Sequence, residues 1–134
     1  MIRLSKRVEY GLLAVRHMAA NPSGTVFTAK ELAAKLDMPY DLLAKVLQRL
    51  ARGGIVSSQQ GIKGGYALAR RPNEISITSV IRTIEYERPM IAECYADGPD
   101  SCYLFDNCGR RKPLGKLQRN LNEVFDKMTV LEIV

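Results

Sequence analysis

Two helix signals separated by a tight turn most strongly limit how this 134-residue chain can fold. Thr28 and Glu31 form a capping-box pattern, in which each side chain bonds the other residue's backbone at a helix start. That helix would run through Leu36. A tight turn at residues 37–38 then precedes Pro39, which suits the first turn of a second helix. Two short helices joined in this way form a helix-turn-helix motif.

The next segment predicts a wing beside the second helix. Successive glycines at 53–54 would end that helix, and one face of it is apolar at helical spacing: Leu43, Val46, Leu47 and Leu50. Two strand-like runs, 55–59 and 66–69, then flank a glycine-rich turn, which is the pattern of a β-hairpin. A hairpin directly after a helix-turn-helix makes the winged form of the motif.

Two further helices would complete this unit. Ser5 can cap a first helix, with Val8, Leu12, Val15 and Ala19 on one stripe. Another short helix, over about 78–85, would bury Val80, Ile81 and Ile84. The sequence therefore predicts a mainly α fold with a winged helix-turn-helix domain over residues 1–87.

Residues 112–134 predict a long helix followed by a short turn. From about Pro113, apolar residues recur at coiled-coil-like spacing: Leu114, Leu117, Leu121, Val124 or Phe125, and Met128. Such a helix cannot bury its stripe alone, so it packs on its own domain or on its twin in a homodimer. Thr129 and Glu132 form a second capping-box pattern, which indicates a final turn.

Charge is divided unevenly between the two halves of the chain. Residues 1–72 carry twelve Lys and Arg against four Asp and Glu, a net charge of +8. Residues 73–134 carry eight against ten, a net charge of −2, which gives +6 overall. A basic half is what binding to a polyanion requires, although a plain solvated surface would look the same.

All three cysteines, Cys94, Cys102 and Cys108, fall in the predicted loop 88–111, where four acidic residues also cluster. Three soft thiolates in a reduced segment suit an iron–sulfur cluster or zinc. Structural zinc sites usually have closer cysteine pairs and four strong ligands. The residues therefore favour a cluster-binding loop, with inert or redox-active thiols as the alternative.

Several classes of protein are disfavoured by what the sequence contains. No apolar run reaches the length of a membrane span, and the basic N-terminus lacks the apolar core of a signal peptide. We therefore expect a cytoplasmic protein with no membrane partner. No Ser/His/Asp set, phosphate loop or paired carboxylates with a nearby nucleophile occurs, so we do not expect an enzyme.

The chain resembles the Rrf2 family of winged helix-turn-helix transcription regulators over essentially its whole length. The matching stretches are residues 1–6, 53–58 and 61–66, together with the three cysteines. The resemblance implies a homodimer that binds a pseudo-palindromic operator in double-stranded DNA. It also implies an iron–sulfur cluster, [4Fe-4S] or [2Fe-2S], on Cys94, Cys102 and Cys108. Seven and then five residues separate these cysteines, whereas five and five is usual in the family.

The family's fourth cluster ligand varies between members. Glu9 matches the position of an acidic first-helix ligand, so the resemblance implies Glu9, reaching in from the other subunit. A surface helix carboxylate is the plain alternative. His17, the only histidine, lies two turns further along the same helix and is a second alternative.

The geometry of the helix-turn-helix selects candidate DNA contacts. The N-terminal turn of the second motif helix meets base edges in the major groove, where Lys45 can donate to guanine and Asp41 can accept from cytosine. The other candidates contact bases, phosphates or the minor groove. The full predicted set is Arg3, Ser5, Lys6, Tyr40, Asp41, Ala44, Lys45, Gln48, Arg49, Gln59, Gln60 and Lys63.

These features predict a transcription regulator whose cluster state controls operator binding, as a sensor of redox state, nitric oxide or iron. One alternative keeps the fold but senses through bare thiols. A second alternative, from another class, is a small iron–sulfur redox protein, against which the basic first half and the wing both argue.

Overall fold

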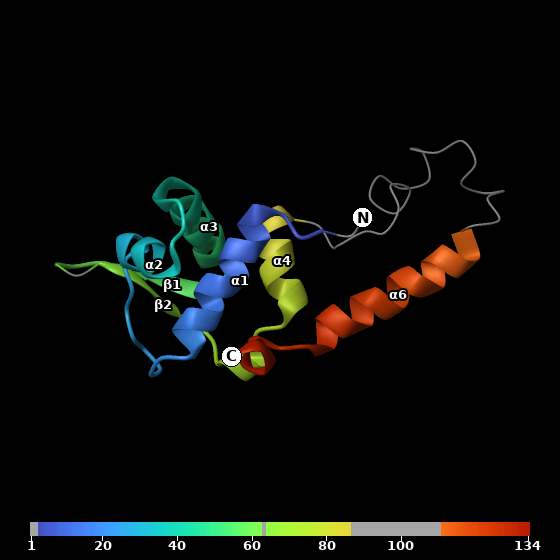
Figure 1. Cartoon of the computed structure of the whole chain (residues 1–134). Helices are drawn as coiled ribbons and strands as arrows, with labels where there is room; N and C mark the ends of the chain where they lie inside the picture. Colours follow the sequence, from blue (N-terminus) through green and yellow to red (C-terminus); the bar gives the residue numbers. More distant parts are fainter. Residues whose placement is uncertain (1–2, 63, 87–110) are drawn as a thin grey trace.

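The computed structural model describes residues 3–62, 64–86 and 111–134, with the side chains of 111 and 112 left out (Figure 1). Most of the described chain is helical, with one two-stranded sheet. The elements, in chain order, are α1 (Lys6–Ala19), α2 (Ala29–Leu36), α3 (Tyr40–Arg52), β1 (Val56–Gln59), β2 (Gly65–Leu68), η1 (Pro72–Glu74), α4 (Ile77–Glu85), α6 (Arg111–Lys127) and η3 (Val130–Ile133).

Helices α2 and α3 form the predicted helix-turn-helix. The Thr28 hydroxyl accepts the Glu31 N–H at 3.1 Å, and a Glu31 carboxylate oxygen accepts the Thr28 N–H at 3.1 Å. Helix α2 then ends at Asp37, whose φ of 53° is left-handed. Pro39 stands just before α3 rather than in its first turn. At that position its missing N–H costs no helix hydrogen bond. Loss of the Thr28 side-chain cap of α2 would typically lower the free energy of unfolding by about 0.5–2 kcal/mol.

Strands β1 and β2 form the predicted wing. They pair antiparallel, with Val56 opposite Leu68 and Gln59 opposite Gly65. Phe27, between α1 and α2, exchanges both backbone hydrogen bonds with Tyr66 at 2.8 and 2.7 Å. A Cβ at Gly65 would lie 2.5 Å from the Phe27 carbonyl oxygen, so glycine is required where these backbones meet. The wing is thereby tied to the body at its base.

The hydrophobic core lies where α1 crosses α3 and α4. The four apolar residues predicted for α3 are buried, as are Val80, Ile81 and Ile84 of α4. On α1, Val8 and Val15 are buried and Leu12 and Ala19 are half-buried, whereas Met18 is a core residue outside the predicted stripe. Burial of one such aliphatic side chain contributes roughly 1.5–3 kcal/mol to the free energy of unfolding.

The C-terminal turn packs on the same core. Val130 is fully buried, its N–H donates to the Ile75 carbonyl at 2.9 Å, and Arg16 of α1 donates to the Ile133 carbonyl at 2.6 Å. Thr129 and Glu132 form the predicted capping box. The chain after α6 is therefore held against α1 and the start of α4.

Helix α6 extends from this anchored end away from the rest of the described chain (Figure 1). It begins at Arg111, two residues before the predicted start at Pro113. Its predicted stripe is only partly covered: Leu114, Leu121, Phe125 and Met128 are half-buried, while Leu117 and Val124 are 54% and 58% exposed. No helix among the described residues is both long and apolar enough to span a membrane.

Candidate DNA interface

The solvent face of α3 carries the residues predicted to contact bases. Tyr40, Asp41, Lys45 and Gln48 are exposed, and Ala44 between them is half-buried. They recur three and four positions apart, which places them on one side of the helix, while the leucines of the opposite side are buried. Helix α3 thus presents a polar row that no element among the described residues covers.

The wing lies at the same end of the molecule as α2 and α3, and α6 lies at the other end (Figure 1). Gln59 and Gln60 are exposed, and the Gln59 amide donates to the Ser57 hydroxyl at 3.0 Å. Lys63 lies outside the described residues. Ile62, beside the wing tip, is fully exposed. The predicted wing contacts are all polar and do not include Ile62, although its place within the glycine-rich turn is visible in the sequence.

The start of α1 carries the third group of predicted contacts. Arg3, Ser5 and Lys6 are exposed. Ser5 also has structural roles: its hydroxyl accepts the Val8 N–H at 3.2 Å and donates to the Glu85 carboxylate at 2.5 Å. These bonds engage the Ser5 hydroxyl, and the Lys6 ammonium bonds the Glu9 carboxylate at 3.0 Å, so Arg3 is the freest of the three for a phosphate.

Arg49, one of the predicted DNA contacts, bonds within the protein instead. Its guanidinium donates to the carbonyl oxygen of Ile84, near the end of α4, at 2.5 Å. The same group stands over the Tyr86 ring, 5.3 Å from the ring centre. Arg49 is half-buried by these contacts, so it faces α4 rather than the solvent-facing row of α3.

Of the predicted cluster ligands, only Glu9 lies within the described residues; Cys94, Cys102 and Cys108 lie outside them. Glu9 is half-buried on α1, with its carboxylate 3.0 Å from the Lys6 ammonium. His17 is half-buried and meets Phe27 edge to face at 5.3 Å, and its Nε2 is buried without a hydrogen-bond partner. Within the part of the chain that the structure describes, no three His, Cys, Asp or Glu side chains gather as a metal site would require.

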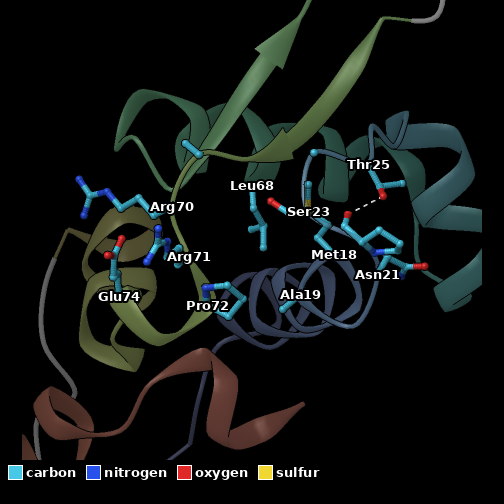
Figure 2. A pocket seen from close by; sticks show the side chains of 13 residues that line it. Met18, Ala19, Asn21, Ser23, Thr25, Leu68, Arg70, Arg71, Pro72 and Glu74 are labelled. Carbon is cyan, nitrogen blue, oxygen red and sulfur yellow. Dashed lines mark hydrogen bonds between the residues drawn. The ribbon is translucent and has the colours of Figure 1, made fainter.

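A surface cavity of about 560 Å³ lies between the end of α1, the α1–α2 connection and the segment from β2 to η1 (Figure 2). Arg70, Arg71 and Glu74 stand on one side of it, and Ser23 and Thr25 on the other. Among the residues that the structure describes, neither the predicted DNA contacts nor Glu9 lines this cavity. The cavity is therefore separate from the candidate DNA contacts on α3, the wing and the start of α1.

A solvent-facing helix in a helix-turn-helix, an adjoining wing and a basic first half define a winged-helix DNA-binding protein. The sequence profile of the Rrf2 family, described as iron-dependent transcriptional regulators, matches residues 4–134. The chain belongs to the Rrf2 family, whose members regulate transcription and are not enzymes.

Individual proteins are similar to this chain over nearly its whole length. The chain is 32% identical to protein aau3 of Rhizobium meliloti (strain 1021) over 133 residues, which cover 99% of this chain and 85% of that protein. It is 26% identical to the transcriptional regulator NsrR of Shouchella clausii over 133 residues, 99% of this chain and 89% of NsrR. CymR, the global cysteine regulator of B. subtilis, has the same fold, with a TM-score of 0.77 at 22% identity over 99% of this chain and 96% of CymR.

Proposed function

We propose that this regulator is a homodimer whose affinity for its operator depends on an iron–sulfur cluster held by Cys94, Cys102 and Cys108. The observation that carries the proposal is that one chain combines two features. The polar face of α3 is exposed, and a segment with three cysteines follows α4. The family description as iron-dependent, and the likeness to NsrR, support it.

The donor set fits an iron–sulfur cluster by its chemistry. Thiolates are the ligands that hold such clusters, and three of them leave one coordination position for a different donor. Glu9 offers a carboxylate from α1, the helix that begins beside Arg3 and Lys6. When bound, the cluster supplies a centre that oxygen, nitric oxide or iron shortage can alter. Whether it is [4Fe-4S] or [2Fe-2S] is decided by the iron and sulfide content of the protein.

The DNA-binding mode follows from the exposed groups. Lys45 and Asp41 face solvent from the first half of α3 and would reach base edges in the major groove. Gln59, Gln60 and Lys63 on the wing, with Ile62 beside them, would meet the minor groove, where apolar side chains can wedge against bases. Arg3 and Lys6 would neutralise phosphates and set the register of the protein on the duplex.

Helix α6 would form the dimer interface, called the seam below. Leu117 and Val124 are one heptad apart and both are exposed, so within the described residues nothing covers this part of the stripe. A two-fold symmetric partner presenting the same stripe would bury both side chains. A dimer of this kind places two copies of α3 for the two halves of a pseudo-palindromic operator.

Two other functions differ from this proposal in measurable ways. A regulator that senses through bare thiols would respond to thiol oxidation while holding neither iron nor sulfide. A small redox protein would hold a cluster and lack salt-dependent affinity for DNA. The name of CymR, a cysteine regulator of the same fold, makes the first of these the stronger alternative.

Anaerobic purification tests the proposal. The protein should be coloured, and it should contain iron and acid-labile sulfide in equal amounts, bound per subunit. Replacement of any one of Cys94, Cys102 or Cys108 by alanine should abolish the visible absorption and leave the far-ultraviolet helical signal unchanged. Colourless wild-type protein that a cluster-assembly system cannot load would contradict the proposal and favour thiol sensing.

A further inference from the structure

The last turn of α4 contacts both α1 and α3. Thr83 lies against the end of α3, because a Cβ at Gly53 would come within 2.3 Å of the Thr83 side chain. Ile84 lies against the middle of α1, because a Cβ at Gly11 would come within 2.3 Å of Ile84 Cδ1. Such close approaches leave little room for α4 to shift without moving its neighbours.

Arg49 adds a polar link between α3 and this turn. Its guanidinium donates to the Ile84 carbonyl, one of the helix-end acceptors that lack a partner within their own helix. A cation also suits the negative end of the α4 dipole. The Tyr86 ring beneath the guanidinium, 5.3 Å away, adds a cation–π contact. One side chain therefore joins α3 to both Ile84 and Tyr86.

Ser5 provides a parallel link to α1. Its hydroxyl caps α1 through the Val8 N–H and donates to Glu85. Tyr86 ends α4 in the left-handed conformation, with a φ of 61°, and its N–H donates to the Arg82 carbonyl at 2.8 Å. In the sequence, Cys94 follows Tyr86 by eight positions. The cysteine-bearing segment is thus joined to a turn that is bonded to two DNA-facing elements.

We propose that Arg49 is a positioning residue that couples the state of the cysteine-bearing segment to the orientation of α3, through Ile84 and Tyr86. This inference rests on the proposed function. A change in the cysteine-bearing segment would reach α3 through Tyr86, the last described residue before that segment, and through the Arg49 contacts to Tyr86 and Ile84. The cysteine-bearing segment at one end and the bound DNA at the other would both act on the Arg49 contacts. Two sites can be coupled when both act on the same contacts in this way.

The test compares Arg49→Met with Arg52→Met. Methionine keeps an aliphatic stem and removes the charge and the hydrogen bond. Arg52 is exposed in the same last turn of α3, so its variant has the same charge change without the contacts to α4. Tyr86→Leu is a second variant, which removes the ring and leaves Arg49 in place; it also serves if Arg49→Met does not fold.

Operator duplexes selected from a random library provide the DNA. Fluorescence anisotropy measures the operator affinity of the cluster-loaded and cluster-depleted forms of each variant, and the ratio of the two is the coupling. Melting temperature, salt dependence and hydrogen exchange of the α3 amides are measured on the same samples. The wild type and Arg52→Met should show a ratio of about fivefold or more, the ordinary size of such coupling. Arg49→Met and Tyr86→Leu should bring the ratio within about twofold of unity.

Three outcomes would overturn the inference. If Arg49→Met weakens both forms equally and lowers the salt slope by about one unit, Arg49 is a phosphate contact. If Arg49→Met lowers the melting temperature and keeps the wild-type ratio, its bonds only stabilise the fold. A wild-type ratio of one would remove the proposed function, and this inference with it, whereas the first two outcomes remove the inference alone.

Discussion

Gly11 of α1 and Ile84 of α4 meet so closely that the two helices leave no room for a side chain at position 11. A Cβ there would lie 2.3 Å from Ile84 Cδ1 and 3.2 Å from Val46 Cγ1. Ile84 and Val46 are themselves almost fully buried, so neither can move aside freely. The crossing of α1 over α4, which sets the position of α3, therefore depends on this glycine.

Gly11→Ala should destabilise the protein by about 1–3 kcal/mol, because the cost of overpacking exceeds the gain of up to about 1 kcal/mol in helix propensity. Chemical denaturation measures the loss. Ile84→Val removes the Cδ1 atom that the new methyl would meet, so the double variant should lose less stability than the sum of the two single variants. Strict additivity would mean that this contact is not the cause.

Lys45→Ala should weaken operator binding by about 1–3 kcal/mol and relax preference at one base position, because the lysine would lose a direct contact to a base. Lys6→Ala should weaken binding to all sequences alike and lower the salt slope by about one unit, as loss of a phosphate contact does. Anisotropy on single-base operator variants separates the two effects. Lys116→Ala, on α6, is the control and should change neither; equal effects of all three would refute the proposed interface.

Leu117→Asp should convert a dimer into a folded monomer. The side chain is 54% exposed in a single chain, so the substitution costs the subunit little, while in the seam it would bury an unpaired charge. Sedimentation equilibrium at micromolar concentration gives the mass. Arg119→Asp, about half a turn away around the same helix, should remain dimeric. A wild type that sediments as a monomer would show that α6 does not form the seam.

Much of this fold can be predicted from short-range patterns in the sequence. The Thr28–Glu31 capping box, the glycines of the wing and the helical spacing of buried residues on α3 act within a few positions, so pattern alone locates those elements. The sequence predicts a start of α6 at about Pro113, and the helix begins at Arg111, so Pro113 lies in its first turn, where the missing N–H costs no helix hydrogen bond.

The contacts of Arg49 could not be read from the sequence. Its acceptor is a backbone carbonyl 35 positions away, and every residue has such a carbonyl. Arg49 and Gln48 are neighbours on α3 and both are predicted DNA contacts, yet burial separates them: Gln48 is exposed, whereas Arg49 is half-buried and faces α4. His17 is similar, since only the fold brings Phe27 against its ring. Sequence patterns identify faces of helices, whereas partners distant in the chain depend on how the helices cross.

Glu9→Ala should keep a cluster on the three thiolates but shorten its lifetime in air, because a carboxylate ligand would be lost. The lifetime is read from the decay of visible absorption. Glu9 also pairs with Lys6 at 3.0 Å, so Lys6→Ala serves as a control that breaks the same ion pair and keeps the carboxylate. If Glu9→Ala matches the wild type in spectrum, lifetime and operator affinity, Glu9 is not a ligand.

The most direct test of the central claim is the operator affinity of one preparation measured when cluster-loaded, after removal of the cluster by a chelator, and after reconstitution. We predict that affinity changes by about fivefold or more on removal and returns on reconstitution. Variants with alanine at Cys94, Cys102 or Cys108 should stay at the cluster-free value throughout. A wild type that binds its operator with the same affinity in all three states would contradict the account.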